Sequence, residues 1–254
     1  MTRERIIKMV FLTLILGVAH SMNMKAQDLK PVVYQDGNQK LNGLVTSNVG
    51  QNLPGVLILP AWQGIDNEAK QAAIDLKKEG YIAFIADIYG EGNIPENSQA
   101  AAKIARHYKT NYEAYQHRIS LALEELKKQG ADKVAVIGYC FGGTGALEAA
   151  RADFPIEGIV SIHGGLDKAT NRQNTSLKTK ILIENPADDK GVTKEIYEAL
   201  VEEMNASKTD WQIITYAHSG HTFTNPESPE YNEVMAKRAW KHTLLFLGEI
   251  LRGE

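Results

Sequence analysis

Short, unbroken apolar segments alternate with helical patterns along most of this 254-residue chain. A strand without polar residues must be covered on both faces, which is typical of parallel sheets flanked by helices. The segments lie at residues 56–59, 81–86, 134–137, 156–162, 180–183 and 211–216; the first three are unbroken and the last three are mainly apolar. The sequence therefore predicts an α/β fold, with a mostly parallel central sheet and helices on both of its faces.

Helical patterns occupy most of the intervals between these segments. The predicted helices span about 66–79, 98–108, 111–129, 142–152 and 193–206. Ser228-Pro229-Glu230 is expected to open the last helix, because proline is favoured in a first turn. Near the start, residues 32–35 and 41–46 flank Asp36-Gly37-Asn38, which predicts two strands joined by a tight turn.

Residues 1–26 have the pattern of a secretory signal peptide. Arg3, Arg5 and Lys8 form a basic start, an apolar run follows at 9–19, and Ala26 provides a small residue for cleavage. The run is shorter than the roughly 20 residues that span a bilayer, although an uncleaved anchor is the alternative. We therefore expect a secreted or periplasmic protein with no stable membrane anchor after cleavage, in which residues 27–254 form a single domain.

Composition argues against several classes of protein. Hydrophobic residues make up 43% of the chain and charged residues 23%, close to the globular average. The formal net charge of -3, without a polybasic segment, argues against nucleic-acid binding. With one cysteine, Cys140, the chain lacks the residues for an internal disulfide or a Cys-based zinc cluster. We expect the protein to need no metal and no cofactor.

The cysteine lies in Gly138-Tyr139-Cys140-Phe141-Gly142-Gly143, after an apolar segment and before a helix. This G-x-C-x-G sequence is the nucleophile-elbow pattern with cysteine in place of serine. Its glycines permit a sharp turn that raises the nucleophile above the sheet, where the helix N-terminus favours a thiolate and the Phe141 N–H faces an oxyanion. The alternatives are a glycine-rich turn with a buried cysteine and a phosphate-binding turn, but this segment matches neither phosphate-loop pattern.

A cysteine nucleophile needs a base and a group that orients the base. Functional groups of parallel sheets lie just beyond the carboxyl ends of the strands. Asp188-Asp189 follow the fifth apolar segment and His221 follows the sixth, in the order nucleophile, acid, histidine that α/β-hydrolases use. His218 is the alternative base, and His163, which follows the fourth segment, is a candidate for the pocket lining.

Other conspicuous residues fit ordinary structural roles. Lys103, Arg106 and Lys109 are spaced as a solvated helix face. Tyr112 and Tyr115 belong to an apolar helix stripe, so we expect them in the core rather than in the site.

The chain resembles the dienelactone hydrolase family from about Leu57 to Leu251. The resemblance is carried by 138–143, Gly80-Tyr81, Asp87-Ile88-Tyr89-Gly90, Ser161-Ile162-His163-Gly164-Gly165, and Gly220-His221-Thr222-Phe223 with Tyr231 and Trp240. It implies an α/β-hydrolase fold and a Cys-His-Asp triad containing Cys140 and His221. It also implies that the Trp62 N–H is the second oxyanion donor, and that Ala61 and Tyr89 line the pocket.

The acid of the triad depends on the alignment to this family. Aligning Val192-Thr193 with the end of the family's acid motif selects Asp189, whereas a shift by one residue selects Asp188. We favour Asp189 and keep Asp188 as the alternative.

Three positions depart from the family pattern. Ala61 stands where many relatives have a glutamate close to the nucleophile. Gly90-Glu91 and Asn225 stand where the archetypal enzyme has arginines that hold an anionic lactone, so the carboxylate-binding fork is missing. The resemblance therefore predicts the reaction class better than it predicts a dicarboxylic lactone as substrate.

Together, these features predict a metal-independent hydrolase of small-molecule carboxylic esters or lactones. Cys140 would attack the carbonyl, His221 would move the proton, Asp189 would orient His221, and a thioester would form. One alternative is a peptidase or a carbohydrate esterase on the same fold. Another is a non-catalytic binding or redox-responsive protein on a hydrolase scaffold.

Overall fold

An eight-stranded sheet forms the centre of the computed structural model, which describes residues 28–169 and 171–254. The strand order is β1-β2-β4-β3-β5-β6-β7-β8; β1 pairs with β2 and β2 with β4 in antiparallel fashion, and all other pairs are parallel. The strands are β1 Leu29–Asp36, β2 Gln39–Thr46, β3 Gly55–Leu59, β4 Ile82–Ile85, β5 Val134–Tyr139, β6 Gly158–Ile162, β7 Lys180–Pro186 and β8 Trp211–Tyr216. The predicted mostly parallel sheet is confirmed.

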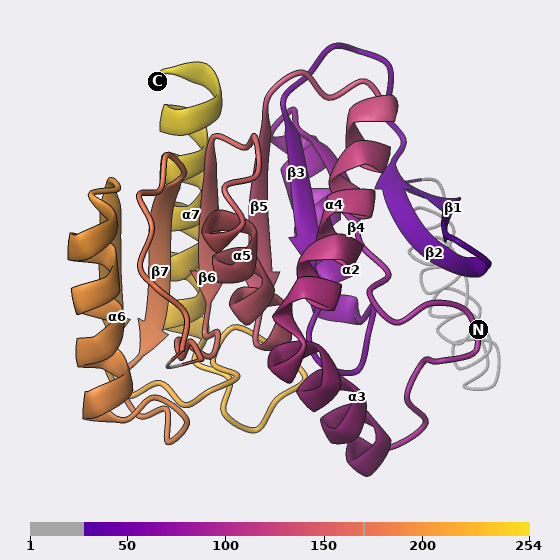
Figure 1. The fold of residues 1–254 in the computed structure, drawn as a ribbon. Coiled ribbons are helices and arrows are strands. Elements are labelled where there is room, and N and C mark those ends of the chain that lie inside the picture. The colour runs from indigo at the N-terminus through magenta and orange to yellow at the C-terminus, as the bar shows by residue number, and fades with distance from the viewer. Residues whose placement is uncertain (1–27, 170) are drawn as a thin grey trace, which may run out of the picture.

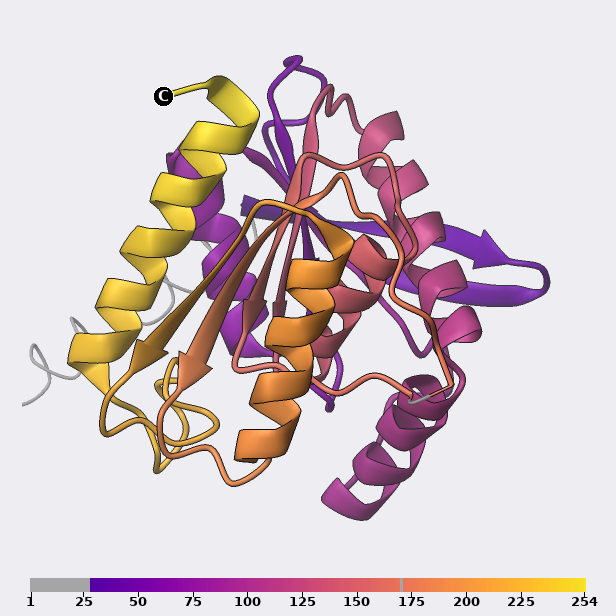
Figure 2. The same cartoon turned by 60° about the vertical axis from the view of Figure 1, so that its left-hand side comes forward.

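Helices cover both faces of this sheet. They are α2 Asn67–Lys78, α3 Ser98–Thr110, α4 Tyr112–Lys128, α5 Phe141–Arg151, α6 Lys194–Ser207 and α7 Glu233–Arg252. Seen along the sheet in Figure 2, α2 and α7 lie on one side, and α4, α5 and α6 lie on the other. Helix α3 lies beyond the carboxyl ends of the central strands (Figure 1), where catalytic groups of such sheets gather.

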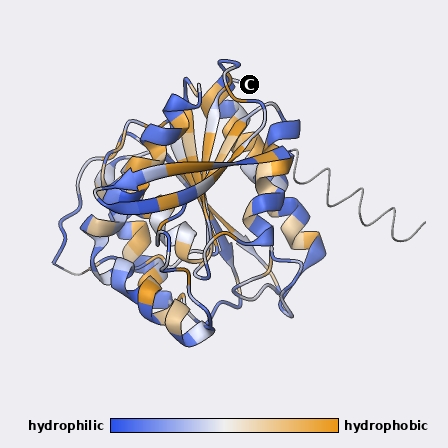
Figure 3. Cartoon of the chain, turned by 90° about the vertical axis from the view of Figure 1, so that its right-hand side faces the viewer, coloured by the Kyte–Doolittle hydropathy of each residue, from blue (hydrophilic) through white to orange (hydrophobic). Residues whose placement is uncertain are grey.

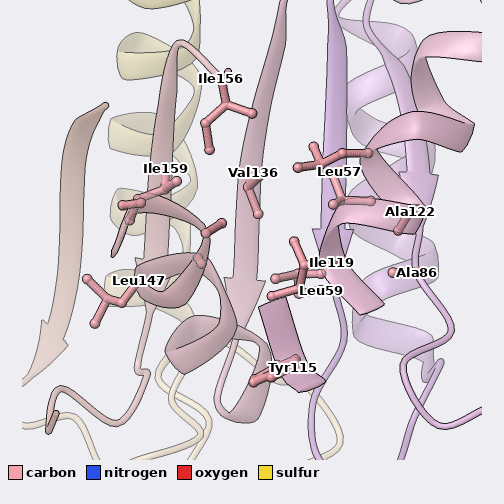
Figure 4. Packing of buried hydrophobic residues seen from close by; sticks show 14 of the residues in the cluster. Leu57, Leu59, Ala86, Tyr115, Ile119, Ala122, Val136, Leu147, Ile156 and Ile159 are labelled. Atoms are coloured by element: carbon pink, nitrogen blue, oxygen red, sulfur yellow. The ribbon is translucent and has the colours of Figure 1, made fainter. Parts of the chain in front are cut away.

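The central strands are apolar because each of their faces packs under a helical layer. In β3, Leu57 and Leu59 join the core beneath α4 and α5, whereas Val56 and Ile58 join the core beneath α2 and α7. Figure 4 shows the first of these cores, in which Tyr115 and Ile119 of α4 approach β3. Apolar strands inside a polar shell are also evident in Figure 3. This rigid core fixes the strand ends that carry the site.

The last helix begins later than the sequence predicted. Its first residue is Glu233, and the Asn232 side chain caps it by accepting from the Met235 N–H at 3.3 Å. Ser228-Pro229-Glu230 instead form a turn, because the Ser228 hydroxyl accepts from the Glu230 N–H at 3.0 Å and its carbonyl accepts from the Tyr231 N–H at 3.1 Å. Local side-chain hydrogen bonds of this kind compete with helix formation.

The prediction of a signal peptide concerns residues that the structure does not describe. In the part of the chain that it does describe, no helix combines the length and apolar character needed to cross a membrane.

Candidate active site

Cys140 occupies the sharp turn between β5 and α5. Its backbone has φ 52° and ψ -110°, a conformation that a non-glycine residue keeps only when the surroundings enforce it. Its N–H is held by the Ile162 carbonyl and by His163 Nδ1, both at 3.1 Å. The thiol is partly exposed and is the group that this turn presents at the carboxyl edge of the sheet.

The two flanking glycines are required by close backbone contacts. A Cβ on Gly138 would lie 2.0 Å from the Gly142 carbonyl oxygen, and a Cβ on Gly142 would lie 1.9 Å from the Leu59 carbonyl oxygen. Both obstacles are backbone atoms, which no rotamer change can move. The G-x-C-x-G spacing therefore reflects how closely α5 approaches β3 and β5.

We expect Gly142→Ala to lower the free energy of unfolding by about 3 kcal/mol or more, since the methyl group overlaps backbone of β3. Urea denaturation measures this value. Gly248→Ala in α7 is the matched control, because its Cβ would meet only the Glu254 side chain, with Oε2 at 3.2 Å and Cβ at 3.9 Å, and no backbone atom of another segment. That control should be neutral or stabilising by up to ~1 kcal/mol. Equal stabilities for the two variants would contradict the close-approach argument.

Cys140, His221 and Asp189 form a continuous hydrogen-bonded row. His221 Nε2 lies 3.0 Å from Cys140 Sγ, and His221 Nδ1 lies 2.7 Å from Asp189 Oδ2. The other carboxylate oxygen, Asp189 Oδ1, accepts from the Gly191 N–H at 2.8 Å. The residues come from the ends of β5, β7 and β8, so the sheet brings together three segments that are distant in sequence.

The alternatives for acid and base lie outside this row. Asp188 is exposed, and its N–H donates to the Ser219 carbonyl at 2.9 Å. His218 is exposed as well, and its carbonyl accepts from Asn232 Nδ2 at 3.1 Å. Asp189, in contrast, is buried to 9% exposure. Of the two aspartates and two histidines considered from sequence, His221 contacts the thiol and Asp189 contacts His221.

The hydrogen bonds of the row favour the protonated form of His221. Hydrogen bonds to Asp189 and to Cys140 raise the pKa of His221 to about 10. Burial alone would raise the pKa of Asp189, but hydrogen bonds from His221 and from the Gly191 N–H hold it below its usual value. The geometry thus favours an imidazolium between a carboxylate and the sulfur across the neutral pH range.

A raised histidine pKa makes stability depend on pH in a defined direction. The stabilisation is fully present below the unfolded-state pKa of about 6.5, and it is lost as the pH rises toward 10. We expect His221→Gln to cost more unfolding free energy at about pH 6 than at about pH 10. Urea denaturation at both pH values tests this, and Asp189→Asn should reduce the pH dependence. A cost that grows toward high pH would contradict the assignment.

Two backbone amides are available beside the thiol. Phe141 N–H is at the first position of α5, and Trp62 lies in the loop after β3 on the wall of the cavity at Cys140. Among the described residues, neither of these two N–H groups donates a hydrogen bond to a backbone carbonyl in a turn, loop or helix cap. The Trp62 carbonyl accepts from the Tyr89 hydroxyl at 2.8 Å, which fixes this loop. The prediction that these two N–H groups hold an oxyanion stays a prediction.

His163 is buried beneath the turn rather than on the wall of the cavity at Cys140. It is 1% exposed, and burial together with the charge on His221 lowers its pKa to about 3. Its Nδ1 accepts from the Cys140 N–H, so the proton of the neutral ring is assigned to Nε2, which meets Thr224 Oγ1 at 2.8 Å. Thr224 in turn donates to Glu68 Oε1 at 2.6 Å. His163 therefore supports the backbone of the turn.

The cavity at Cys140 has a volume of about 270 Å³, and two cationic side chains are among the residues that line it. Its lining residues are Trp62, Ala102, Ala105, Arg106, Lys109, Cys140 and Phe141. The sequence predicted Arg106 and Lys109 on a solvated helix face; they are exposed, yet they also face this cavity. The available signal was the spacing of Ala102, Ala105, Arg106 and Lys109, which places small and cationic residues on one face of α3.

The remaining predicted pocket residues lie behind or beside this cavity. Tyr89 is 2% exposed, and its ring packs against Phe141 with centroids 5.7 Å apart. Ala61 is partly exposed at the start of the loop that carries Trp62.

Of the two tyrosines predicted in the core, Tyr115 is fully buried and stacks on Phe141 with ring centroids 4.5 Å apart. Tyr112 is only partly buried, with the Arg172 guanidinium over its ring, so its placement in the core was wrong.

The two positions at which the archetypal family enzyme has arginines make other contacts in this structure. Glu91 pairs with Lys40 at 3.7 Å on the surface, and Asn225 lines another cavity, between α2 and α7. In residues 28–169 and 171–254, no three His, Cys, Asp or Glu side chains are arranged to hold a metal ion.

Comparison with known proteins identifies the fold and then the family. A dienelactone hydrolase-like promiscuous phosphotriesterase from metagenomic libraries superposes with a TM-score of 0.81, at 29% identity, over 87% of this chain and 98% of its own, which confirms an α/β-hydrolase fold. The model of the Dienelactone hydrolase family matches residues 41–251, and the chain therefore belongs to that family. It is a dienelactone hydrolase-like hydrolase.

Curated relatives have names that refer to lactone chemistry. A protein of Bradyrhizobium sp. named "Probable 2-oxo-3-(5-oxofuran-2-ylidene)propanoate lactonase" is 27% identical over 86% of this chain and 93% of the relative. A carboxymethylenebutenolidase of a Pseudomonas species is 25% identical over 76% of this chain and 84% of the relative.

Proposed function

We propose that this protein hydrolyses small-molecule carboxylic esters or lactones through a cysteine nucleophile. The observation that carries the proposal is the row Cys140–His221–Asp189, with contacts of 3.0 Å and 2.7 Å. An imidazolium beside a partly exposed sulfur is the arrangement that produces a thiolate nucleophile. The names of the lactonase and carboxymethylenebutenolidase relatives support lactones as one substrate class.

In the first half-reaction the Cys140 thiolate attacks the carbonyl carbon, a C–S bond forms, and the carbonyl π electrons move to oxygen. The N–H groups of Phe141 and Trp62 stabilise this oxyanion, each by about 3–4 kcal/mol. Collapse of the tetrahedral intermediate breaks the C–O bond. The leaving alkoxide takes the proton from His221, and a thioester remains on Cys140.

In the second half-reaction His221, now neutral, removes a proton from water as that water attacks the thioester. The new tetrahedral intermediate expels the Cys140 thiolate and releases the carboxylic acid. Asp189 orients the imidazole ring throughout and stabilises it when protonated. The row then returns to its starting state.

A substrate panel tests the reaction class. Wild type and Cys140→Ala are assayed side by side on an aryl ester, a lactone, an acetylated sugar, a short peptide and an aryl phosphotriester. We expect ester or lactone turnover in the wild type and its loss in the variant. Turnover of the peptide or acetylated sugar alone would favour the alternative hydrolases. No turnover of any compound would favour a non-catalytic role.

We also propose that the protein acts outside the cytoplasm, in the periplasm or as a secreted protein. The proposal is supported by the basic start and apolar run of residues 1–26. Fractionation of expressing cells, with the mass of the mature protein, tests it. A full-length protein in the cytoplasmic fraction would overturn it.

The two cations in the cavity at Cys140 favour a substrate that carries a carboxylate next to its ester. We expect the double variant Arg106→Gln and Lys109→Gln to lower kcat/KM about tenfold for an ester with an added carboxylate, mainly through KM. Hydrolysis of its neutral analogue should change little. Steady-state kinetics on the two esters measures the difference, and added salt should reduce it.

Lys103→Gln is the control for this prediction. Lys103 lies on the same helix but lines a different cavity, near residues 92–97. It should leave the ratio between the two esters unchanged. An equal effect of Lys103→Gln would show that the general charge of α3, rather than the cavity, sets the preference.

A further inference from the structure

A second cavity, larger than the one at Cys140, lies on the opposite side of the sheet. Its volume is about 510 Å³, within the range of small-molecule sites. Helices α2 and α7, which cover the same face in Figure 2, supply most of its wall, and residues 224–227 close one side. It contains none of Cys140, His221 and Asp189, so the triad does not account for it.

At the inner wall of this cavity lies Glu184, a fully buried carboxyl group of β7. Its Oε1 accepts from the Thr243 hydroxyl at 3.0 Å, whereas its Oε2 has no hydrogen-bond partner among the described residues. A buried polar atom without a partner destabilises the folded state, and more so if it is charged. The Tyr216 hydroxyl is close enough to Glu184 to lower its pKa slightly, but its hydrogen bond within 3.5 Å is to His242 Nδ1, at 2.8 Å. A ligand that donates to Oε2 would remove this destabilisation.

Further carboxyl groups line the same cavity. Glu68 is partly buried on α2, and Asp75 and Glu227 lie farther out. Burial raises the pKa of Glu184 to about 8 and that of Glu68 to about 7, which is typical of carboxyl groups that lack a cationic partner. The lysines of the cavity, Lys237 and Lys241, are exposed, and Lys237 is paired with Glu233 at 2.6 Å. The inner part of the cavity therefore holds two carboxyl groups that form no salt bridge with the described residues, and a bound cation would favour their ionised forms.

The rest of the wall is largely apolar and aromatic. Tyr139, Ile162, Ala72, Ala239 and Trp240 line it. Such a surface suits the hydrocarbon or aromatic body of a ligand, and an aromatic face attracts a nearby cation. The chemistry that complements an acidic inner end and an apolar wall is a cationic amine on an apolar body.

We propose that this cavity binds an organic ammonium ion, with Glu184 as its counter-ion and the wall between α2 and α7 holding its apolar part. This site differs from the cavity at Cys140 in the charge of its lining side chains as well as in its location. There, Arg106 and Lys109 disfavour a cation; here, buried carboxyl groups favour one. Ammonium binding at this site does not depend on the ester hydrolysis proposed for Cys140.

The probe for this site is 2-phenylethylammonium, with 2-phenylethanol as the neutral analogue and 3-phenylpropanoate as the anionic one. Titration calorimetry, supported by the fluorescence of the wall residue Trp240, reports binding to the full protein. We expect saturable binding of one ammonium ion per chain, with an affinity at least about tenfold above that of the alcohol. The anion should not bind at this site.

Three variants distinguish this site from nonspecific binding. Glu184→Gln keeps the shape of the side chain and should weaken ammonium binding about tenfold or more. Ala236→Trp fills the cavity from α7 and should abolish binding, whereas the exposed Glu198→Gln on α6 should not change it. Binding that survives Ala236→Trp, equal affinity for amine and alcohol, or no saturable binding would each overturn the proposal.

Discussion

Cys140→Ala is expected to lower kcat/KM for carboxylic esters by at least about a thousandfold. The methyl group cannot form the C–S bond, so only the oxyanion donors and the binding surface remain to assist water. The variant should fold, because the turn is held by backbone hydrogen bonds to Ile162 and His163 and not by the sulfur. Steady-state kinetics measures the loss, and circular dichroism with thermal unfolding verifies the fold.

Cys140→Ser is the matched control for the nucleophile. A hydroxyl group fits the turn but must lose its proton, and His221, with its pKa raised to about 10, is already protonated near neutral pH. We expect Cys140→Ser to stay at least about tenfold below the wild type. Activity of Cys140→Ala within about tenfold of the wild type would remove Cys140 from the mechanism.

The second large effect concerns the acid of the triad. Asp189→Asn is expected to lower kcat by about a hundredfold to a thousandfold, because an amide in place of Oδ2 no longer holds His221 in the required tautomer and charge. Asp188→Asn is the adjacent control, since Asp188 is exposed and lies outside the row. It should change kcat less than about threefold.

The ratio between these two variants decides the assignment. A large loss in Asp188→Asn together with a small loss in Asp189→Asn would contradict it. The rate of Cys140 alkylation by iodoacetamide as a function of pH provides an independent readout. Asp189→Asn should change this pH profile, because it removes the main cause of the raised pKa of His221. A merely structural role for Asp189 would leave the profile unchanged.

Much of the fold could be predicted because the central strands are buried on both faces. Unbroken apolar segments such as 134–137 fit few structures besides a buried parallel strand once glycines and helix caps bound them. The predicted start of α7 was wrong because proline at 229 fits a turn as well as a first helical turn. The Ser228 hydroxyl, by accepting from the Glu230 N–H, favours the turn.

The chemistry of the site could be predicted to the level of residue types and chain order. The choice between Asp188 and Asp189 followed from family alignment, whereas the structure distinguishes them by direction. The turn after β7 directs Asp189 toward His221, and it leaves Asp188 exposed. Local sequence does not encode this direction, because it depends on how the ends of β7 and β8 lie together.

Contacts made across the fold account for what the sequence did not predict. Arg106 and Lys109 follow the pattern of a solvated helix face, and only the position of α3 beyond the strand ends brings them to Cys140. The hydrogen-bonded row from His163 through Thr224 to Glu68 joins three segments that are distant in sequence and belong to no common sequence motif. In the sequence, Glu184 is one polar residue at the end of an apolar segment. Its burial depends on how α7 packs over β7, which the local sequence does not show.

The central claim is that Cys140 carries the acyl group during turnover, and rapid-quench mass spectrometry of the protein and of its peptides tests it most directly. The wild type is mixed with an aryl acetate, quenched in acid and digested. We expect one acetyl group per chain, located on the peptide that contains Cys140 and absent from Cys140→Ala. An acetyl group on another side chain that forms and decays at the rate of turnover, or the same adduct in Cys140→Ala, would contradict the claim.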